Sequence, residues 1–200
     1  MPVIPEGSLL FDFPDADNWH AFKYDEKDKS RPGFYQECLE KTDGIKGVDI
    51  VAGISPGFHT ITLIEIKDFS GHAHDLKEEV RSGAIPLEIL QKAPHTCSGL
   101  YLGARNKTPL LAPDLRAAVR RPSQRLEVVF FLAEDPVRTS LPAHERRQKE
   151  LSRRTRRQDL LKKMREKFKP LGIPCDLAEL GDLPERCGWT VTTPQATDET

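Results

Sequence analysis

The sequence is poor in cysteine and contains no long apolar run. Its 200 residues include only four cysteines, and no stretch approaches the roughly eighteen apolar residues that a membrane span needs. The cysteines are scattered without CxxC spacing, so neither a zinc site nor a disulfide framework is indicated, and free thiols are expected. The first residues lack the basic start and apolar core of a signal peptide. We therefore expect a cytoplasmic protein with no membrane association.

Internal repeats and a phosphate-binding glycine loop are also missing from the sequence. Apolar residues make up 38% of the chain and charged residues 30%, a balance that suits one globular core of this length. We expect a single domain over residues 1–193 and a disordered polar tail over residues 194–200.

Charge is distributed unevenly although the formal net charge is only −1. Residues 141–170 contain twelve Lys and Arg against four Asp and Glu, which gives +8 and leaves −9 for the rest of the chain. Apolar residues at helical spacing in the second half predict a helix with one buried stripe. Four arginines crowd its first half: Arg153, Arg154, Arg156 and Arg157. Such a segment predicts contact with a nucleic-acid backbone, and an acidic protein partner or no role remain as alternatives.

The most informative stretch is Gly47–Asp68, which reads as two β-strands joined by a turn at Ser55-Pro56-Gly57. Successive side chains of a strand point to opposite faces, so Glu65 and Lys67 share one face of the second strand. Asp49 lies at the start of the first strand. A hairpin of the two strands would bring Asp49 close to Glu65 and Lys67.

Ionisable side chains inside such apolar strands are costly unless they are paired, hydrated or bound to a metal. One interpretation is a salt bridge between Glu65 and Lys67 at the exposed end of the strand. The other is a metal site, because the carboxylates of Asp49 and Glu65 and the intervening carbonyl of Ile66 are hard oxygen ligands suited to Mg²⁺. A nearby lysine such as Lys67 can orient the attacking water or stabilise an anionic transition state.

This arrangement resembles the motif of the PD-(D/E)xK, or restriction-endonuclease-like, nuclease superfamily. That motif is an Asp at a strand start followed by Glu-x-Lys on the neighbouring strand, and the matching residues are Asp49 and Glu65-Ile66-Lys67. Val48 replaces the Pro of the motif's name. The sequence pattern VDIV…LIEIKDFSGH is also similar to that of a group of small bacterial proteins in that superfamily. The resemblance spans roughly residues 10–190, and residues 45–106 carry its specific features.

The resemblance implies an α/β fold with an αβββαβ core, in which helices cover both faces of a mixed sheet of about five strands. It also implies a metal-dependent nuclease that hydrolyses phosphodiester bonds, with DNA favoured over RNA as substrate. Asp49, Glu65 and the Ile66 carbonyl would hold Mg²⁺, or Mn²⁺ as a substitute, and Lys67 would activate the hydrolytic water. Cleavage in this superfamily generally leaves a 5′-phosphate.

The resemblance also implies supporting residues around the site. Gln91 and Lys92 lie on the helix expected after the Glu-x-Lys strand, where members of the superfamily direct a Gln or Lys at the site. An acidic residue upstream is a further expectation, and Asp25, Glu26 and Glu37 are equivalent candidates.

The chain leaves no room for a separate recognition domain, so we expect specificity to come from a homodimer or from a partner protein, as in nucleases of defence systems or mobile elements. The alternative function is a non-catalytic nucleic-acid-binding or structural subunit on the same fold.

The remaining patterns give the expected element order. Residues 1–14 are predicted to be an irregular lead-in and residues 15–29 a short helix, while residues 34–40 fit either a strand or a helix. Residues 125–133 form an apolar run bounded by turn signals, which predicts a buried strand beside the Glu65 strand. The other predicted elements are helices starting at Asp75 and Leu87 and closing strands within residues 172–180 and 187–193.

Overall fold

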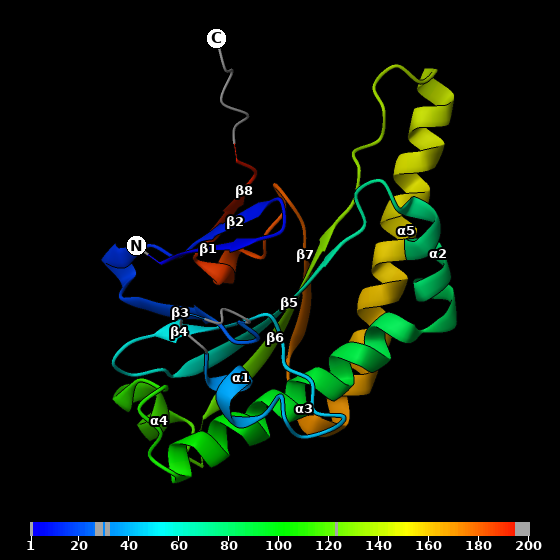
Figure 1. The fold of residues 1–200 in the computed structure, drawn as a ribbon. Helices are drawn as coiled ribbons and strands as arrows, with labels where there is room; N and C mark the ends of the chain where they lie inside the picture. Colours follow the sequence, from blue (N-terminus) through cyan, green and yellow to red (C-terminus); the bar gives the residue numbers. More distant parts are fainter. Residues whose placement is uncertain (1, 27–29, 31–32, 123, 195–200) are drawn as a thin grey trace.

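A five-stranded mixed sheet lies at the centre of the protein, in the order β3-β4-β5-β6-β7 (Figure 1). The computed structural model describes residues 2–26, 30, 33–122 and 124–194. Strands β3, β4 and β5 pair antiparallel, whereas β5, β6 and β7 pair parallel. The strand bounds are β3 Trp19–Lys23, β4 Ile50–Ile54, β5 Thr60–Asp68, β6 Arg125–Ala133 and β7 Cys175–Ala178.

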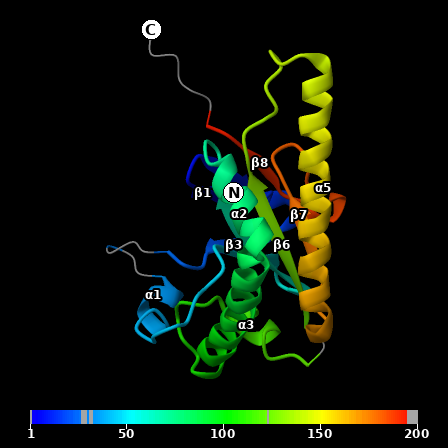
Figure 2. The ribbon, with the colours of Figure 1, turned by 90° about the vertical axis from the view of Figure 1, so that its right-hand side faces the viewer.

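Helices make the connections between the parallel strands. Three of them separate β5 from β6: α2 (Ala73–Ser82), α3 (Ala84–Arg105) and α4 (Pro113–Ala118). The long helix α5 (Ala143–Phe168) connects β6 to β7, and its first turns project beyond the sheet (Figures 1 and 2). Parallel neighbours need such crossover connections, because a tight turn can join only antiparallel strands.

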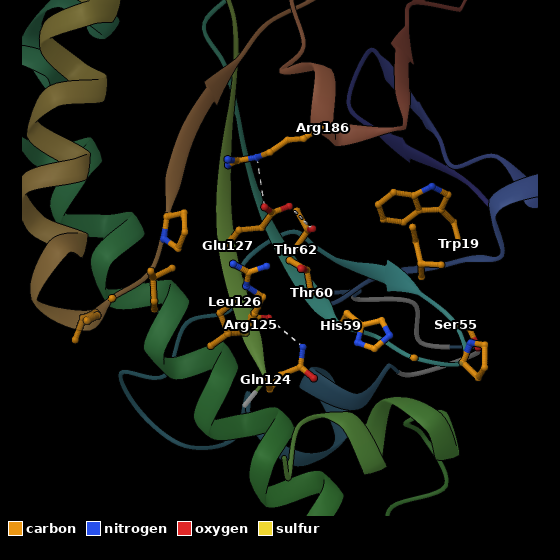
Figure 3. A pocket seen from close by; sticks show the side chains of 17 residues that line it. Trp19, Ser55, His59, Thr60, Thr62, Gln124, Arg125, Leu126, Glu127 and Arg186 are labelled. Carbon is orange, nitrogen blue, oxygen red and sulfur yellow. Dashed lines mark hydrogen bonds and ion pairs between the residues drawn. The ribbon is translucent and has the colours of Figure 1, made fainter. Parts of the chain in front are cut away.

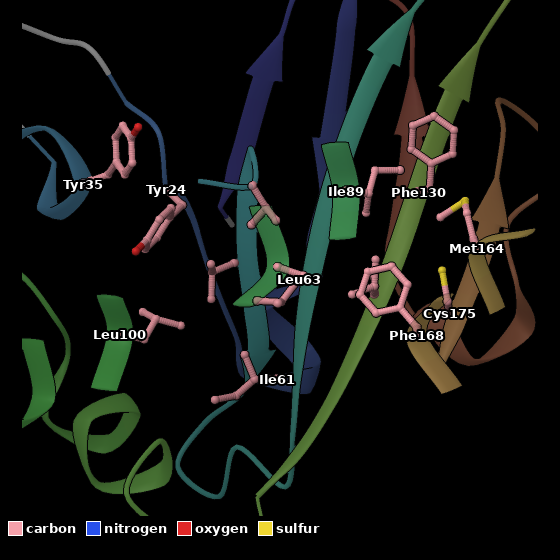
Figure 4. Packing of buried hydrophobic residues seen from close by; sticks show 14 of the residues in the cluster. Tyr24, Tyr35, Ile61, Leu63, Ile89, Leu100, Phe130, Met164, Phe168 and Cys175 are labelled. Carbon is pink, nitrogen blue, oxygen red and sulfur yellow. The ribbon is translucent and has the colours of Figure 1, made fainter. Parts of the chain in front are cut away.

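The main hydrophobic core lies between the sheet and the α-helices of the described residues. The odd-numbered residues Ile61 and Leu63 of β5 point into this core, which also contains Ile89 and Leu100 of α3 (Figure 4). The even-numbered side chains of β6 belong to the same core, and Phe130 packs near Met164 of α5. The period of two along each strand therefore assigns alternate residues to the helical face.

The opposite face of the sheet is covered by a small antiparallel sheet of order β1-β2-β8. Its strands are β1 Val3–Glu6, β2 Leu9–Asp12 and β8 Thr190–Thr192. Phe11 packs edge-on against Phe131 of β6 and also contacts the buried Trp189. The expectation of helices on both faces was therefore wrong: the α-helices lie on one face, and a second sheet covers part of the other.

The N-terminal predictions were wrong as well. The predicted irregular lead-in contains β1 and β2, and the predicted helix over residues 15–29 is a 3-10 turn, Asp15–Asp17, followed by strand β3. Residues 27–29 of that range lie outside the described part. Pairing with β4, from Trp19 opposite Ile54 to Lys23 opposite Ile50, overrides the weak local preference for a helix.

Several other predictions are confirmed. Strands β4 and β5 form the predicted hairpin, with Ile50 opposite Ile64, and β6 pairs with β5 along its whole length. Residues 34–40 adopt the helical alternative as α1 (Phe34–Cys38), and the basic segment predicted over 141–170 is helix α5. Of the predicted tail, residues 195–200 lie outside the described residues. No helix within the described ranges is long and apolar enough to cross a membrane.

Candidate active site

Asp49 and Glu65 come together on the helical face of the sheet. Asp49 immediately precedes β4, and its amide donates to the Ile64 carbonyl at 3.1 Å. Its carboxylate accepts a hydrogen bond from the Ile66 amide at 2.5 Å. Glu65 is fully buried and Asp49 is 8% exposed. The hairpin thus holds the two carboxylates on neighbouring strands, as the sequence predicted.

Helix α3 fixes the start of β4. The hydroxyl of Thr96 accepts from the Val48 amide at 3.0 Å and donates to the Lys92 carbonyl one turn earlier at 2.9 Å. Thr96 is itself fully buried. The residue before Asp49 is therefore tied to the same helix turn that carries Lys92, which fixes the position of Asp49 relative to α3.

The ammonium group of Lys92 lies between the two carboxylates. Its Nζ is 2.5 Å from Glu65 Oε1 and 3.8 Å from Asp49 Oδ1. The Lys92 side chain is only 13% exposed, so the three groups interact in a medium that screens charge poorly. Lys92 was predicted to support the site, and the structure places it at the centre.

Lys67 contacts a different carboxylate. Its Nζ is 2.8 Å from Glu88 Oε2, while Glu88 Oε1 lies 3.9 Å from Lys92 Nζ. Lys67 lies on the face of the sheet that the helices cover, as the alternation along β5 predicted. Glu88 and Lys92 of α3 lie on the same side of the sheet. A Glu65–Lys67 salt bridge was the simpler interpretation of the sequence, but it is not among the ion pairs of the described residues. Lys67 instead pairs with Glu88, and Glu65 pairs with Lys92.

Burial dominates the proton affinity of these groups. The pKa of Glu65 is raised to about 8, mainly by burial and also by the charge of Asp49, while Lys92 opposes both effects. Burial likewise raises the pKa of Asp49 to about 6, against Lys92 and the hydrogen bond from Ile66. Burial alone would lower the pKa of Lys92, but Glu65 and Asp49 more than offset it and the pKa is raised. The site therefore holds protons and positive charge more tightly than the same groups in water.

The donor set fits a hard divalent cation in two respects. Glu65 Oε2 is buried and has no hydrogen-bond partner among the described residues, although such an oxygen normally has one. The Ile64 carbonyl accepts a hydrogen bond from the Asp49 amide on the β4 side of β5. Carbonyl groups two residues apart in a strand point the same way, so the Ile66 carbonyl faces the same side. In the described part of the chain, no group of three or more His, Cys, Asp and Glu gathers as a metal cluster. Water would therefore have to complete the coordination, as is usual for Mg²⁺.

The other predicted residues differ in their placement. The charge of Asp25 contributes to the raised pKa of Asp49, and so does that of Glu6 on β1, whereas Glu37 is exposed on α1. Among the upstream candidates, Asp25 therefore acts electrostatically on Asp49, and so does Glu6, which was not singled out from the sequence. Gln91 is exposed on α3, while Lys92 beside it faces the carboxylates.

Three of the four arginines of α5 bond to glutamates of the same chain. Glu134 lies 3.1 Å from Arg153 Nε, accepts a hydrogen bond from Arg157 at 3.1 Å and also contacts Arg156. Glu179 lies 2.6 Å from Arg153 and 2.8 Å from Arg157. The two glutamates directly follow β6 and β7. Glutamates of the chain itself thus offset the charge of three of these arginines, while Arg154 is exposed.

A cavity of about 1040 Å³ lies on the opposite face of the sheet (Figure 3). Trp19 lines one side, and Thr60, Thr62 and Glu127 come from the strands beneath. Glu127 is already bonded to Thr62 at 2.7 Å and to Arg186 at 3.4 Å. The cavity therefore lacks the paired carboxylates of the candidate site and is separated from them by the sheet.

Comparison with models of protein families, with curated proteins and with solved structures found no match to this chain. The candidate site must therefore be judged on its own geometry.

Besides Glu6, two residues of that geometry were not predicted from the sequence: Glu88 and Thr96. The i, i+4 spacing of Glu88 and Lys92 was a usable signal, but only the docking of α3 on the sheet reveals what they contact.

Proposed function

We propose that this protein is a metal-dependent nuclease that hydrolyses phosphodiester bonds, with DNA as the favoured substrate. The observation that carries the proposal is the convergence of Asp49 and Glu65 on one point, in a buried site on the helical face of the sheet. The antiparallel strands β3, β4 and β5 and the helical crossover to the parallel strand β6 support the βββαβ portion of the core that the resemblance implies, with helix α1 inserted between β3 and β4. The leading helix of that core has no counterpart within residues 15–26.

Asp49, Glu65 and the Ile66 carbonyl would hold Mg²⁺ or Mn²⁺. The bound ion would supply a water of lowered pKa and stabilise charge on the phosphoryl oxygens. Lys67, at the rim with 27% of its side chain exposed, would orient the attacking water. Glu88 keeps the Lys67 ammonium in place at 2.8 Å, and the fixed strands hold these groups without reorganisation during the reaction.

The test is incubation of supercoiled, linear and single-stranded DNA, and of RNA, with the purified chain and Mg²⁺ or Mn²⁺. We expect metal-dependent cleavage that is lost in Asp49→Asn and in Lys67→Ala. Glu37→Gln, at an exposed position of α1, is the matched control and should cleave at the wild-type rate. Cleavage that persists in Asp49→Asn, or that needs no metal, would contradict the proposal.

A non-catalytic role is the second candidate, and one observation favours it. Lys92 already contacts Glu65 at 2.5 Å, so these polar groups can form a closed network that only stabilises the fold. This alternative predicts that Mg²⁺ leaves the melting temperature unchanged. A rise in melting temperature with Mg²⁺ that disappears in Asp49→Asn would exclude it, because a ligand that binds only the folded state stabilises that state.

A further inference from the structure

We infer that Lys92 is an exchangeable internal counter-ion of the candidate site, and that Glu88 is the positioning residue that receives its ammonium group when a divalent cation enters. This inference rests on the proposed function. It concerns what happens to the chain's own positive charge when a metal ion binds between Asp49 and Glu65.

The first step of the argument is the need for a cation. Glu65 is fully buried and Asp49 is nearly so, and two carboxylates in such surroundings repel each other and lose hydration. Lys92 Nζ, at 2.5 and 3.8 Å from them, supplies the compensating charge. It therefore occupies the position that a cation shared by the two carboxylates would take.

The second step is competition. Lys92 contacts Glu65 Oε1, and Oε2 is the oxygen without a partner among the described residues. An ammonium group and a divalent ion on the same two carboxylates would repel each other strongly in a poorly screened site even if the ion bonds to Oε2. Entry of the metal ion therefore requires the Lys92 ammonium to leave. The displaced charge, at a side chain only 13% exposed, needs another anion nearby.

Glu88 provides that anion. It lies one helical turn before Lys92, and a Glu four residues before a Lys is the favourable order for a helical ion pair. Its Oε1 is already 3.9 Å from Lys92 Nζ, while its Oε2 bonds to Lys67 at 2.8 Å. A change in the side-chain torsions of Lys92 would complete the new pair without movement of the backbone. Glu88 is more exposed than Glu65, with 26% of its side chain accessible, so the transfer also moves the charge toward solvent.

The exchange predicts opposite effects of two substitutions on metal affinity. Lys92→Met removes the competitor and should tighten Mn²⁺ binding by about tenfold or more, while Glu88→Gln removes the acceptor and should weaken it by about fivefold, within the usual range of coupling between sites. In the double variant, Glu88→Gln should have no further effect, because no ammonium group is left to receive. Lys46→Met is the matched control: it removes a neighbouring exposed charge that acts on Glu88, and it should change the affinity less than twofold.

The measurement is calorimetric titration of the full chain with Mn²⁺ in the absence of nucleic acid. Unchanged or weaker binding by Lys92→Met would overturn the exchange, and so would an equal effect of Glu88→Gln with and without Lys92. If Lys92→Met fails to fold, Lys92→Gln takes its place, and Glu88→Gln alone must still weaken binding. If the wild type binds Mn²⁺, Asp49→Asn does not, and the effects of Lys92→Met and Glu88→Gln are absent, the exchange alone fails. If no form binds Mn²⁺, the proposed function fails with it.

Discussion

The stability of the metal-free protein should fall as the pH rises from 6 to 8, and Glu65 should cause most of the fall. The pKa of Glu65 is raised from 4.5 to about 8 by its burial. A group with a higher pKa in the folded state binds its proton more tightly there. Its contribution to stability is complete below the unfolded value and is lost as the pH rises through the folded value.

The magnitude follows from the size of the shift. Each pKa unit corresponds to about 1.4 kcal/mol, so one group that titrates near pH 8 when folded and near 4.5 when unfolded loses about 2 kcal/mol between pH 6 and pH 8. Asp49, with a pKa of about 6, adds a smaller loss at the lower end of the range. His20 has a lowered pKa because of burial, so it acts in the opposite direction around pH 6.5 and partly masks the trend.

Urea unfolding at pH 6, 7 and 8 measures the effect, and comparison of the wild type with Glu65→Gln isolates it from His20. The wild type should lose about 2 kcal/mol more than the variant across this range, because glutamine does not titrate. Glu37→Gln should follow the wild type. Equal slopes for the wild type and Glu65→Gln would refute the reasoning that burial controls this carboxyl.

Three further substitutions test the packing and the charge network. Gly99→Ala places a methyl group against Leu39 and the Tyr24 hydroxyl, so unfolding free energy should fall by about 1–2 kcal/mol despite the better helix propensity of alanine; an unchanged urea midpoint would contradict this. Tyr24→Phe removes a buried hydroxyl that lacks a partner among the described residues, so stability should stay within about 1 kcal/mol of the wild type, and a loss above about 2 kcal/mol would reveal an unseen partner. Glu134→Gln leaves three guanidinium groups without their shared carboxylate and should lower the free energy of unfolding by about 2 kcal/mol. Glu150→Gln, on the exposed part of α5, is the control and should have the melting temperature of the wild type.

The local patterns of the sequence were sufficient to predict the central hairpin and its charged residues. Alternation along Thr60–Asp68 is a property of the strand itself, so it placed Glu65 and Lys67 on one face before any partner strand was known. The apolar run of Arg125–Ala133 likewise identified a buried strand from its own composition. These predictions succeeded because the necessary signal lies within a few neighbouring residues.

The predictions that failed depend on distant partners. Strand β2 pairs with β8, so Leu10 lies opposite Thr192 near the other end of the sequence, and nothing within the first fourteen residues reveals that pairing. The pairing of Lys67 with Glu88 rather than with a carboxylate of the hairpin was hidden for the same reason. It depends on where α3 docks, and that is decided by the whole core.

The glutamates at the ends of β6 and β7 change what the arginine-rich helix presents to its surroundings. A count of charges assigns +8 to residues 141–170, but the electric field outside a protein depends on the charges that remain after internal neutralisation. Because Glu134 and Glu179 anchor Arg153, Arg156 and Arg157, the attraction of this region for an approaching polyanion is weaker than its composition suggests. The ion pairs attach the long helix to the ends of two strands. The electric field that remains outside the protein comes from exposed side chains such as Arg154.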